Sequence, residues 1–150
     1  MPRSTVNGFL IVLIATLCLI QPARADRPKF SDNQIIAMTP SYFKKMRQSP
    51  DFLGAEIYRH PQRGKVFQVN VRVNRNNQTE NLGYAFDAML ALSQYFKRPP
   101  KLFVAVLHTD SKGIAPVVCT GDAKCTINHF IHQRITYKEW YNKCITFQEH

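Results

Sequence analysis

The most constraining feature of the sequence is a strict alternation of apolar and polar side chains over residues 67–74. The apolar residues take every second position: Phe67, Val69, Val71 and Val73. The polar residues between them are Gln68, Asn70, Arg72 and Asn74. A period of two is typical of a strand with one buried and one wet face. We therefore predict a sheet that is buried on the side of Phe67 and exposed to solvent on the side of Arg72.

The segments on either side extend this sheet. Residues 56–60 precede the alternating strand, and the turn residues of 60–64 join the two segments, which predicts a β-hairpin. After a polar loop over 74–81, residues 82–97 return to helical spacing, and Pro99-Pro100 prevents the helix from continuing. Residues 102–107 are apolar at every position, which predicts a strand in the middle of the sheet that is covered on both faces.

The remaining segments complete an α+β fold. Capping signals predict a short helical turn after Ser31 and a helix from Pro40 to Gln48. Residues 114–119 and 125–133 have the pattern of two further strands, and a capping box formed by Thr136 and Glu139 predicts a last helix. The expected order is α-β-β-α-β-β-β-α, in which helices cover a mainly antiparallel five-stranded sheet.

This order of elements resembles that of profilin-like and roadblock-like domains. Members of those families mostly act as scaffolds or binding modules, so the resemblance implies a binding role. It concerns the order of elements alone and involves no shared sequence motif.

The first 25 residues are expected to be a cleaved export signal. Arg3 precedes an unbroken apolar run over 9–20, and Ala23 and Ala25 place small residues where a signal peptidase cleaves. The alternative, a membrane anchor, needs about 20 apolar residues, more than this run supplies. Cleavage before Asp26 leaves residues 26–150, which we expect to form a single domain in the periplasm or outside the cell.

The chain carries a large excess of positive charge. It has 20 Lys and Arg against 10 Asp and Glu, a formal net charge of +10, and loss of residues 1–25 removes two of the basic residues. Such an excess favours anionic partners such as acidic polysaccharide, lipid headgroups, nucleic acid or an acidic protein. The simpler interpretation is a solvated surface that keeps the protein soluble.

Four basic residues are the candidate binding residues: Arg59, Arg63, Lys65 and Arg72. Arg72 projects from the polar side of the alternating strand, and the other three lie in or beside its hairpin partner. Guanidinium groups bind phosphate, sulfate and carboxylate in a two-point fashion. Nucleic acid is a less suitable ligand, because it also needs several aromatic side chains and only Tyr58 is nearby. We therefore expect a non-catalytic binding domain for an anionic ligand or an acidic protein; charges that merely block edge-to-edge aggregation are the alternative.

Three cysteines follow the export signal: Cys119, Cys125 and Cys144. An oxidising compartment makes at least one disulfide expected. In the predicted hairpin, Cys119 and Cys125 face one another within disulfide range, so we predict this pair. Loop entropy would instead favour closure of either residue with Cys144. If Cys144 stays unpaired, its place on the helical stripe of Trp140 predicts a buried, unreactive thiol, and an intermolecular disulfide or a reactive nucleophile is the alternative.

A small hydrolase is the rival function. His108 and Asp110 follow the central strand, where loops often carry catalytic side chains, and Thr109 and Ser111 are close in sequence. No Gly-x-Ser-x-Gly elbow is present, so we assign no catalytic residue. His129 and His132 would lie on opposite faces of the predicted strand and lack the spacing of zinc ligands, so we expect neither a metal ion nor a cofactor.

One modification motif is present. Asn77-Gln78-Thr79 matches the acceptor pattern for N-glycosylation and lies in the predicted loop over 74–81. The motif has a function only in a eukaryotic secretory pathway.

Overall fold

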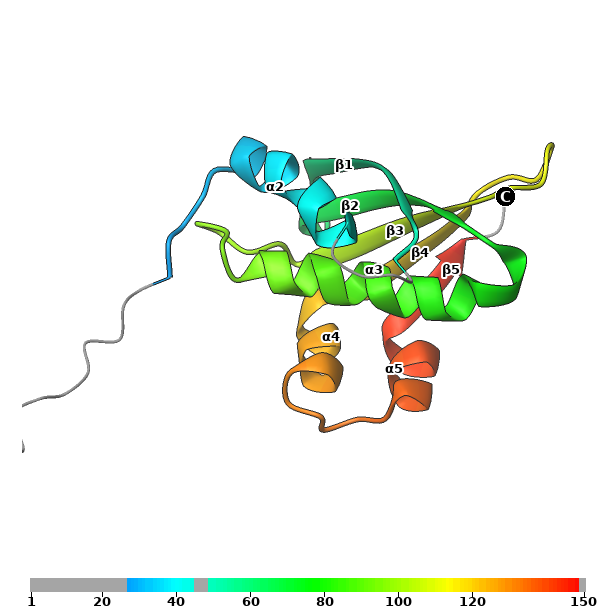
Figure 1. Ribbon diagram of the computed structural model, residues 1–150. Helices are drawn as coiled ribbons and strands as arrows, with labels where there is room; N and C mark the ends of the chain where they lie inside the picture. The colour runs from blue at the N-terminus through cyan, green and yellow to red at the C-terminus, as the bar shows by residue number, and fades with distance from the viewer. Residues whose placement is uncertain (1–26, 45–48, 149–150) are drawn as a thin grey trace, which may run out of the picture.

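The computed structural model describes residues 27–44 and 49–148 (Figure 1). The expected export signal and its cleavage site lie outside the described residues. The helices are α2 (Asp32–Lys44), α3 (Gln78–Ser93), α4 (Ala123–Phe130) and α5 (Tyr137–Cys144), with a 3-10 turn η1 (Arg75–Asn77). The strands are β1 (Asp51–His60), β2 (Gly64–Val73), β3 (Leu102–Thr109), β4 (Val117–Asp122) and β5 (Ile145–Gln148). The predicted α+β class with a mainly antiparallel five-stranded sheet is confirmed.

The strands lie side by side in sequence order, from β1 at one edge to β5 at the other. Strands β2 and β3 are parallel because α3 crosses back between them, and every other neighbouring pair is antiparallel. The predicted β1–β2 hairpin and the central position of β3 are confirmed.

The helices pack on one face of the sheet. Figure 1 shows α3 running across this face, with α4 and α5 beneath it. Phe67, Val69, Val71 and Val73 are all buried there with the apolar side chains of α2 and α3. Arg72 points to the other face, and its side chain is 52% exposed. The predicted division of β2 into a buried and a solvent-facing side is confirmed.

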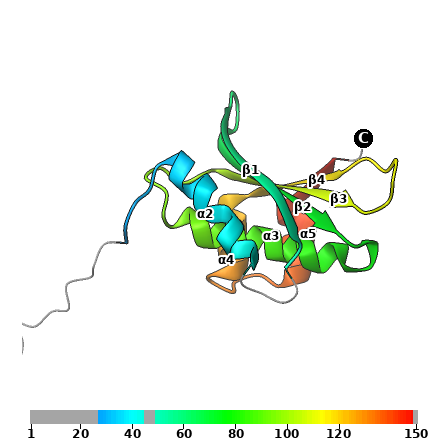
Figure 2. The ribbon, with the colours of Figure 1, turned by 45° about the horizontal axis from the view of Figure 1, so that its top comes forward.

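The second face of the sheet carries a small apolar cluster of its own, and none of the helices described here lies over it (Figure 2). Val66, Val104 and Val106 are buried there, with Leu102 and Val118 packed against them. The continuous apolar run of β3 thus serves both clusters, since alternate residues face opposite ways. This second face is referred to below as the open face.

Residues 125–133 do not form the predicted strand, and this prediction was wrong. Their first part belongs to α4, which begins where the Asp122 carboxylate accepts a hydrogen bond from the Cys125 N–H at 2.8 Å. The fifth strand is instead β5, at the end of the described chain, where it pairs with β4. The observed order is therefore α-β-β-α-β-β-α-α-β. It is not the order on which the resemblance to profilin-like and roadblock-like domains depended.

Two helix boundaries also differ from expectation. Helix α2 is continuous through Pro40, and the Thr39 hydroxyl, expected to cap a second helix, donates to the Ile35 carbonyl within the same helix at 2.8 Å. Helix α3 begins at Gln78, so the segment expected as a loop is largely helical. Asn77 of the glycosylation motif is exposed at the junction between η1 and α3.

The disulfide joins Cys125 to Cys144, with a Cα–Cα distance of 5.8 Å, and corrects the predicted Cys119–Cys125 pair. Because Cys125 lies on a helix and not on a strand opposite Cys119, the cross-strand geometry assumed for that pair does not exist. Cys119 is free and fully buried on β4. Burial raises the pKa of its thiol to about 12, so the unpaired thiol stays protonated and unreactive.

Candidate anion-binding cleft

A cleft of about 670 Å³ opens at the end of the sheet where β1 turns into β2. Its walls come from the hairpin, from the chain that leads into α2, and from the loop between α3 and β3. Asp32 is the acidic residue of the lining. The basic residues of the lining are Arg59, Lys65, Lys97, Arg98 and Lys101. We call this site the basic cleft.

Lys65 belongs to the hairpin wall of the cleft and contacts the other two walls. It lies opposite Arg59 in the hairpin, so the two side chains project from the same face. Its ammonium group contacts Asp32 Oδ1 at 2.5 Å and the Arg98 carbonyl at 3.2 Å, and it lies 4.8 Å from the centre of the Phe96 ring. The charge of Lys65 is therefore already balanced by Asp32.

The hairpin turn brings Lys101 into the cleft. Gly64 has a φ of +82°, a backbone conformation that favours glycine, and a Cβ at this position would come within 3.1 Å of Lys101 Cδ. The Lys101 N–H also donates to the Lys65 carbonyl at 2.9 Å. The turn therefore allows the Lys101 side chain to run across it and holds the α3–β3 loop against β2.

The other basic groups of the cleft differ from Lys65 in their ion pairing. Among the ion pairs of the described residues, none involves Arg59, Lys97, Arg98 or Lys101. All four residues are exposed, and the apolar side chains of Phe30, Ile57 and Pro99 lie between them. Several like charges around one concave, partly apolar surface produce a strong local field that attracts anions.

The structure separates the four predicted binding residues. Arg59 and Lys65 line the basic cleft, and Arg63 lies on the hairpin turn beside it. Arg72 lies seven positions after Lys65 on β2, which places it about 23 Å from Lys65 at the usual rise of a strand. It is paired with Asp51 at 4.0 Å and with Asp110 at 3.7 Å, so its charge is largely compensated.

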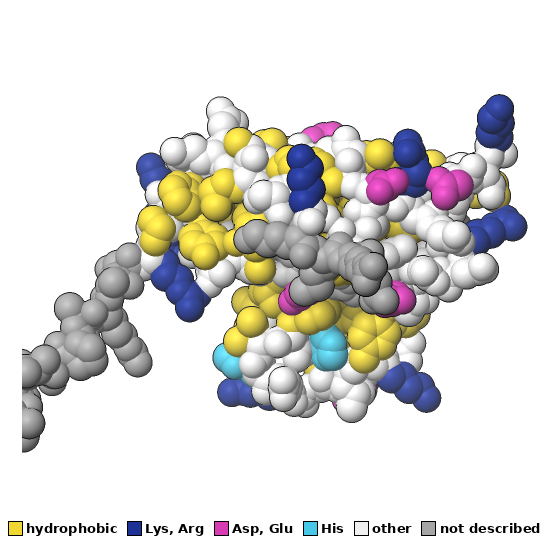
Figure 3. All heavy atoms as spheres, in the orientation of Figure 1, with side chains coloured by type: hydrophobic (Ala, Val, Ile, Leu, Met, Phe, Trp, Pro, Cys, Tyr) yellow, Lys and Arg dark blue, Asp and Glu magenta, His cyan; other side chains and the backbone are white. Residues whose placement is uncertain are grey.

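Net charge alone would not have located the cleft. Figure 3 shows lysine and arginine side chains spread over the visible face, with acidic groups between several of them. The residues that sequence reasoning missed are Lys97, Arg98 and Lys101. The available signal was their spacing, because the three basic residues flank the Pro-Pro pair, which lies in the loop between β3 and α3, the helix that ends at Ser93.

The polar residues proposed for the rival hydrolase form other contacts. The Asp110 carboxylate pairs with Arg72, and His108 Nε2 lies 3.5 Å from Asn70 Oδ1. Thr109 Oγ1 is buried and has no hydrogen-bond partner among the described residues. Within the part of the chain that the structure describes, no hydrogen bond connects His108 to a hydroxyl group that could serve as a nucleophile.

The two histidines considered as metal ligands are on or just after α4. His129 stacks on Trp140 with a ring-centroid distance of 5.5 Å, and its Nδ1 lies 3.0 Å from the Ile135 carbonyl. His132 is exposed beyond the end of the helix. Over residues 27–44 and 49–148, no three His, Cys, Asp or Glu side chains gather in a way that would hold a metal ion.

Comparison with known proteins supplies no functional assignment. No protein-family model matches the chain, and no curated protein or solved structure is significantly similar to it. Within the described residues, no helix is long and apolar enough to cross a membrane. The geometry and charge of the basic cleft are therefore the features of the molecule that bear on its function.

Proposed function

We propose that the protein is an exported, non-catalytic binding domain that holds an anionic ligand or an acidic protein partner in its basic cleft. The observation that carries this proposal is the set of four basic side chains around a single concave surface, none of which is in an ion pair within residues 27–44 and 49–148. The Cys125–Cys144 disulfide supports the exported location, since disulfides persist mainly in oxidising compartments.

The cleft is suited to oxyanions in particular. Arg59 and Arg98 supply planar forks that bind phosphate, sulfate or carboxylate through two parallel hydrogen bonds. Lys97 and Lys101 add point charges without a fixed geometry.

Binding has more support than catalysis at this site. The cleft lining includes neither His nor Cys, and the Ser31 hydroxyl is engaged with Gln34 Oε1 at 3.1 Å. A nucleophile and an activating base are therefore not adjacent in the cleft. The rival hydrolase at His108 has less support, because its expected carboxylate partner, Asp110, pairs with Arg72.

The test is a charge-matched pair of triple variants. Substitution of Arg59, Lys97 and Arg98 by glutamine removes three charges from the cleft, and substitution of Arg75, Lys112 and Lys138, all exposed and outside the cleft, removes three charges elsewhere. Titration with a fully sulfated heparin disaccharide should show an affinity about tenfold or more lower for the cleft variant, with a weaker dependence on salt. The control variant should stay within about twofold of the unsubstituted protein.

Equal losses in the two variants would show that the ligand responds to net charge and not to the cleft. Unchanged affinity in the cleft variant would contradict the proposal directly. Far-ultraviolet circular dichroism of both variants checks that the fold is retained.

A further inference from the structure

A second pocket, of about 320 Å³, lies on the open face of the sheet next to the β1–β2 hairpin. The hairpin contributes a cationic group, Arg63, at one end. The floor is part of the open-face apolar cluster, with Val66, Val104 and Val118. Its other polar groups are mostly amides and a hydroxyl, from Gln62, Gln68, Thr120 and Gln148. We call this site the sheet-side pocket.

The two cavities share one residue, Tyr58 of the edge strand β1. Its side chain is among the exposed large apolar groups, with 41% of the residue accessible. Its hydroxyl donates to Gln68 Oε1 at 3.3 Å, and burial together with the nearby Glu56 raises the pKa of the phenol, so it remains a donor at neutral pH. Because β1 is the edge of the sheet in the part of the chain that the structure describes, no further described strand separates the cleft from the pocket at this point.

Basic groups flank this connection on both sides. Arg59 projects on the side of the basic cleft, and Arg63 lies in the lining of the sheet-side pocket. Neither residue takes part in an ion pair among the described residues. An extended ligand that crosses Tyr58 would therefore meet cationic groups before and after the crossing.

The lining of the two cavities differs in a way that restricts the ligand. The basic cleft requires several anionic groups, whereas the amides and hydroxyl of the sheet-side pocket both donate and accept hydrogen bonds and so suit hydroxyl groups. Tyr58 offers one flat apolar face at the crossing. Single-stranded nucleic acid would need a series of aromatic platforms for its bases, and the linings of the two cavities supply Phe30 and Tyr58 alone among their Phe, Tyr and Trp residues.

We infer that the ligand of the proposed function is an acidic polysaccharide, whose chain passes from the basic cleft over Tyr58 into the sheet-side pocket. This inference rests on the proposed function, because the anionic groups of the same chain occupy the basic cleft. Compared with the proposed function, the inference specifies the chemical class of the ligand, a minimum length for it, and a second set of contacts in the sheet-side pocket.

The experiment compares a heparin-derived disaccharide with a hexasaccharide by isothermal titration calorimetry. We expect the hexasaccharide to bind about tenfold or more tightly, because the shorter ligand does not reach both cavities. Arg63→Gln should lower the affinity for the hexasaccharide about fivefold and leave the disaccharide unaffected. Arg75→Gln, which removes the same charge from an exposed site outside both cavities, should change neither value.

The outcomes separate the two proposals. If neither saccharide binds, the basic cleft does not hold sulfated ligands, and the inference is wrong together with the oxyanion-binding form of the proposed function. If the disaccharide binds but the hexasaccharide is no tighter, or Arg63→Gln has no selective effect, the path over Tyr58 is wrong while the basic cleft remains. A single-stranded oligonucleotide with the same number of charges should bind at least tenfold more weakly than the hexasaccharide, and equal affinity would overturn the assignment to a polysaccharide.

Discussion

Replacement of Trp140 by alanine is expected to lower the free energy of unfolding by about 4 kcal/mol, within the range found for deletion of buried aromatic side chains. Trp140 is fully buried in α5, and its ring centroid lies 5.3 Å from that of Phe86 on α3 and 5.2 Å from that of Phe130 on α4. It is therefore a central side chain in the packing of α5 against α3 and α4, beside Tyr137, whose hydroxyl donates to the Thr79 carbonyl of α3. Denaturant unfolding followed by circular dichroism measures the loss.

Trp140→Phe is the matched control. It keeps an aromatic ring in the cluster and removes the Nε1 group, which donates to Thr126 Oγ1 at 3.4 Å. We expect this variant to lose about 1–2 kcal/mol, since it gives up one buried hydrogen bond and part of the ring volume. A Trp140→Ala variant as stable as the Phe variant would show that α4 and α5 do not pack as the structure describes.

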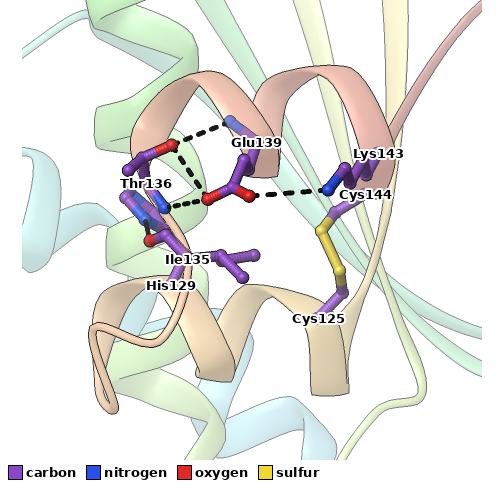
Figure 4. Close-up of polar contacts among 7 residues, drawn as sticks. All are labelled: Cys125, His129, Ile135, Thr136, Glu139, Lys143 and Cys144. Atoms are coloured by element: carbon purple, nitrogen blue, oxygen red, sulfur yellow. Dashed lines mark hydrogen bonds and ion pairs between the residues drawn. A yellow bond between two sulfur atoms is a disulfide. The ribbon is translucent and has the colours of Figure 1, made fainter.

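Removal of the Cys125–Cys144 disulfide is expected to cost about 3 kcal/mol of unfolding free energy. The two cysteines are 19 residues apart, and the chain-entropy model gives a value of about that size for closure of such a loop. Figure 4 shows the disulfide joining α4 to the C-terminal end of α5, whereas the capping box lies at the N-terminal end of α5. A Cys125→Ser, Cys144→Ser double variant, unfolded in denaturant beside the unsubstituted protein, measures the effect.

Cys119→Ala provides the control for this disulfide. It removes the free, buried thiol and leaves the bonded pair intact, so we expect a loss of about 1 kcal/mol and no new reactivity toward thiol reagents. Peptide mapping of the non-reduced protein should recover Cys125 linked to Cys144. Recovery of Cys119 linked to either of the other cysteines would contradict the assignment, as would equal stability of the double variant and the unsubstituted protein.

The predictions that succeeded depended on local sequence patterns that indicate the same secondary structure whatever the rest of the fold is. The alternation around Phe67 defines a half-buried strand wherever it lies, because side chains in a strand alternate between faces. The capping box of Thr136 and Glu139 is equally local, and the structure shows both of its hydrogen bonds.

The strand prediction for residues 125–133 was wrong because a short apolar run of this kind is compatible with a strand and with a helix equally well. The deciding group was Asp122, which lies before the run and caps α4. That one error also produced the wrong disulfide, since a strand would have placed Cys125 opposite Cys119. The order of elements was wrong for the same reason.

The basic cleft could be predicted only in part, because its residues come from three separate segments. The hairpin itself identified Arg59 and Lys65. The contact between Lys65 and Asp32 joins residues 33 positions apart, and no local pattern reports such a contact. Lys97, Arg98 and Lys101 reach the cleft because the α3–β3 loop folds against β2, which is a property of the tertiary structure.

The most direct test of the central claim is chemical-shift mapping of the sulfated disaccharide on isotope-labelled protein. We expect the largest amide shifts at Lys65, Lys97, Arg98 and Lys101, together with Arg59, and small shifts around Arg72 and Asp110 at the opposite end of β2. Shifts concentrated around Arg72, or scattered over all basic residues alike, would contradict the assignment of the basic cleft as the anion-binding site.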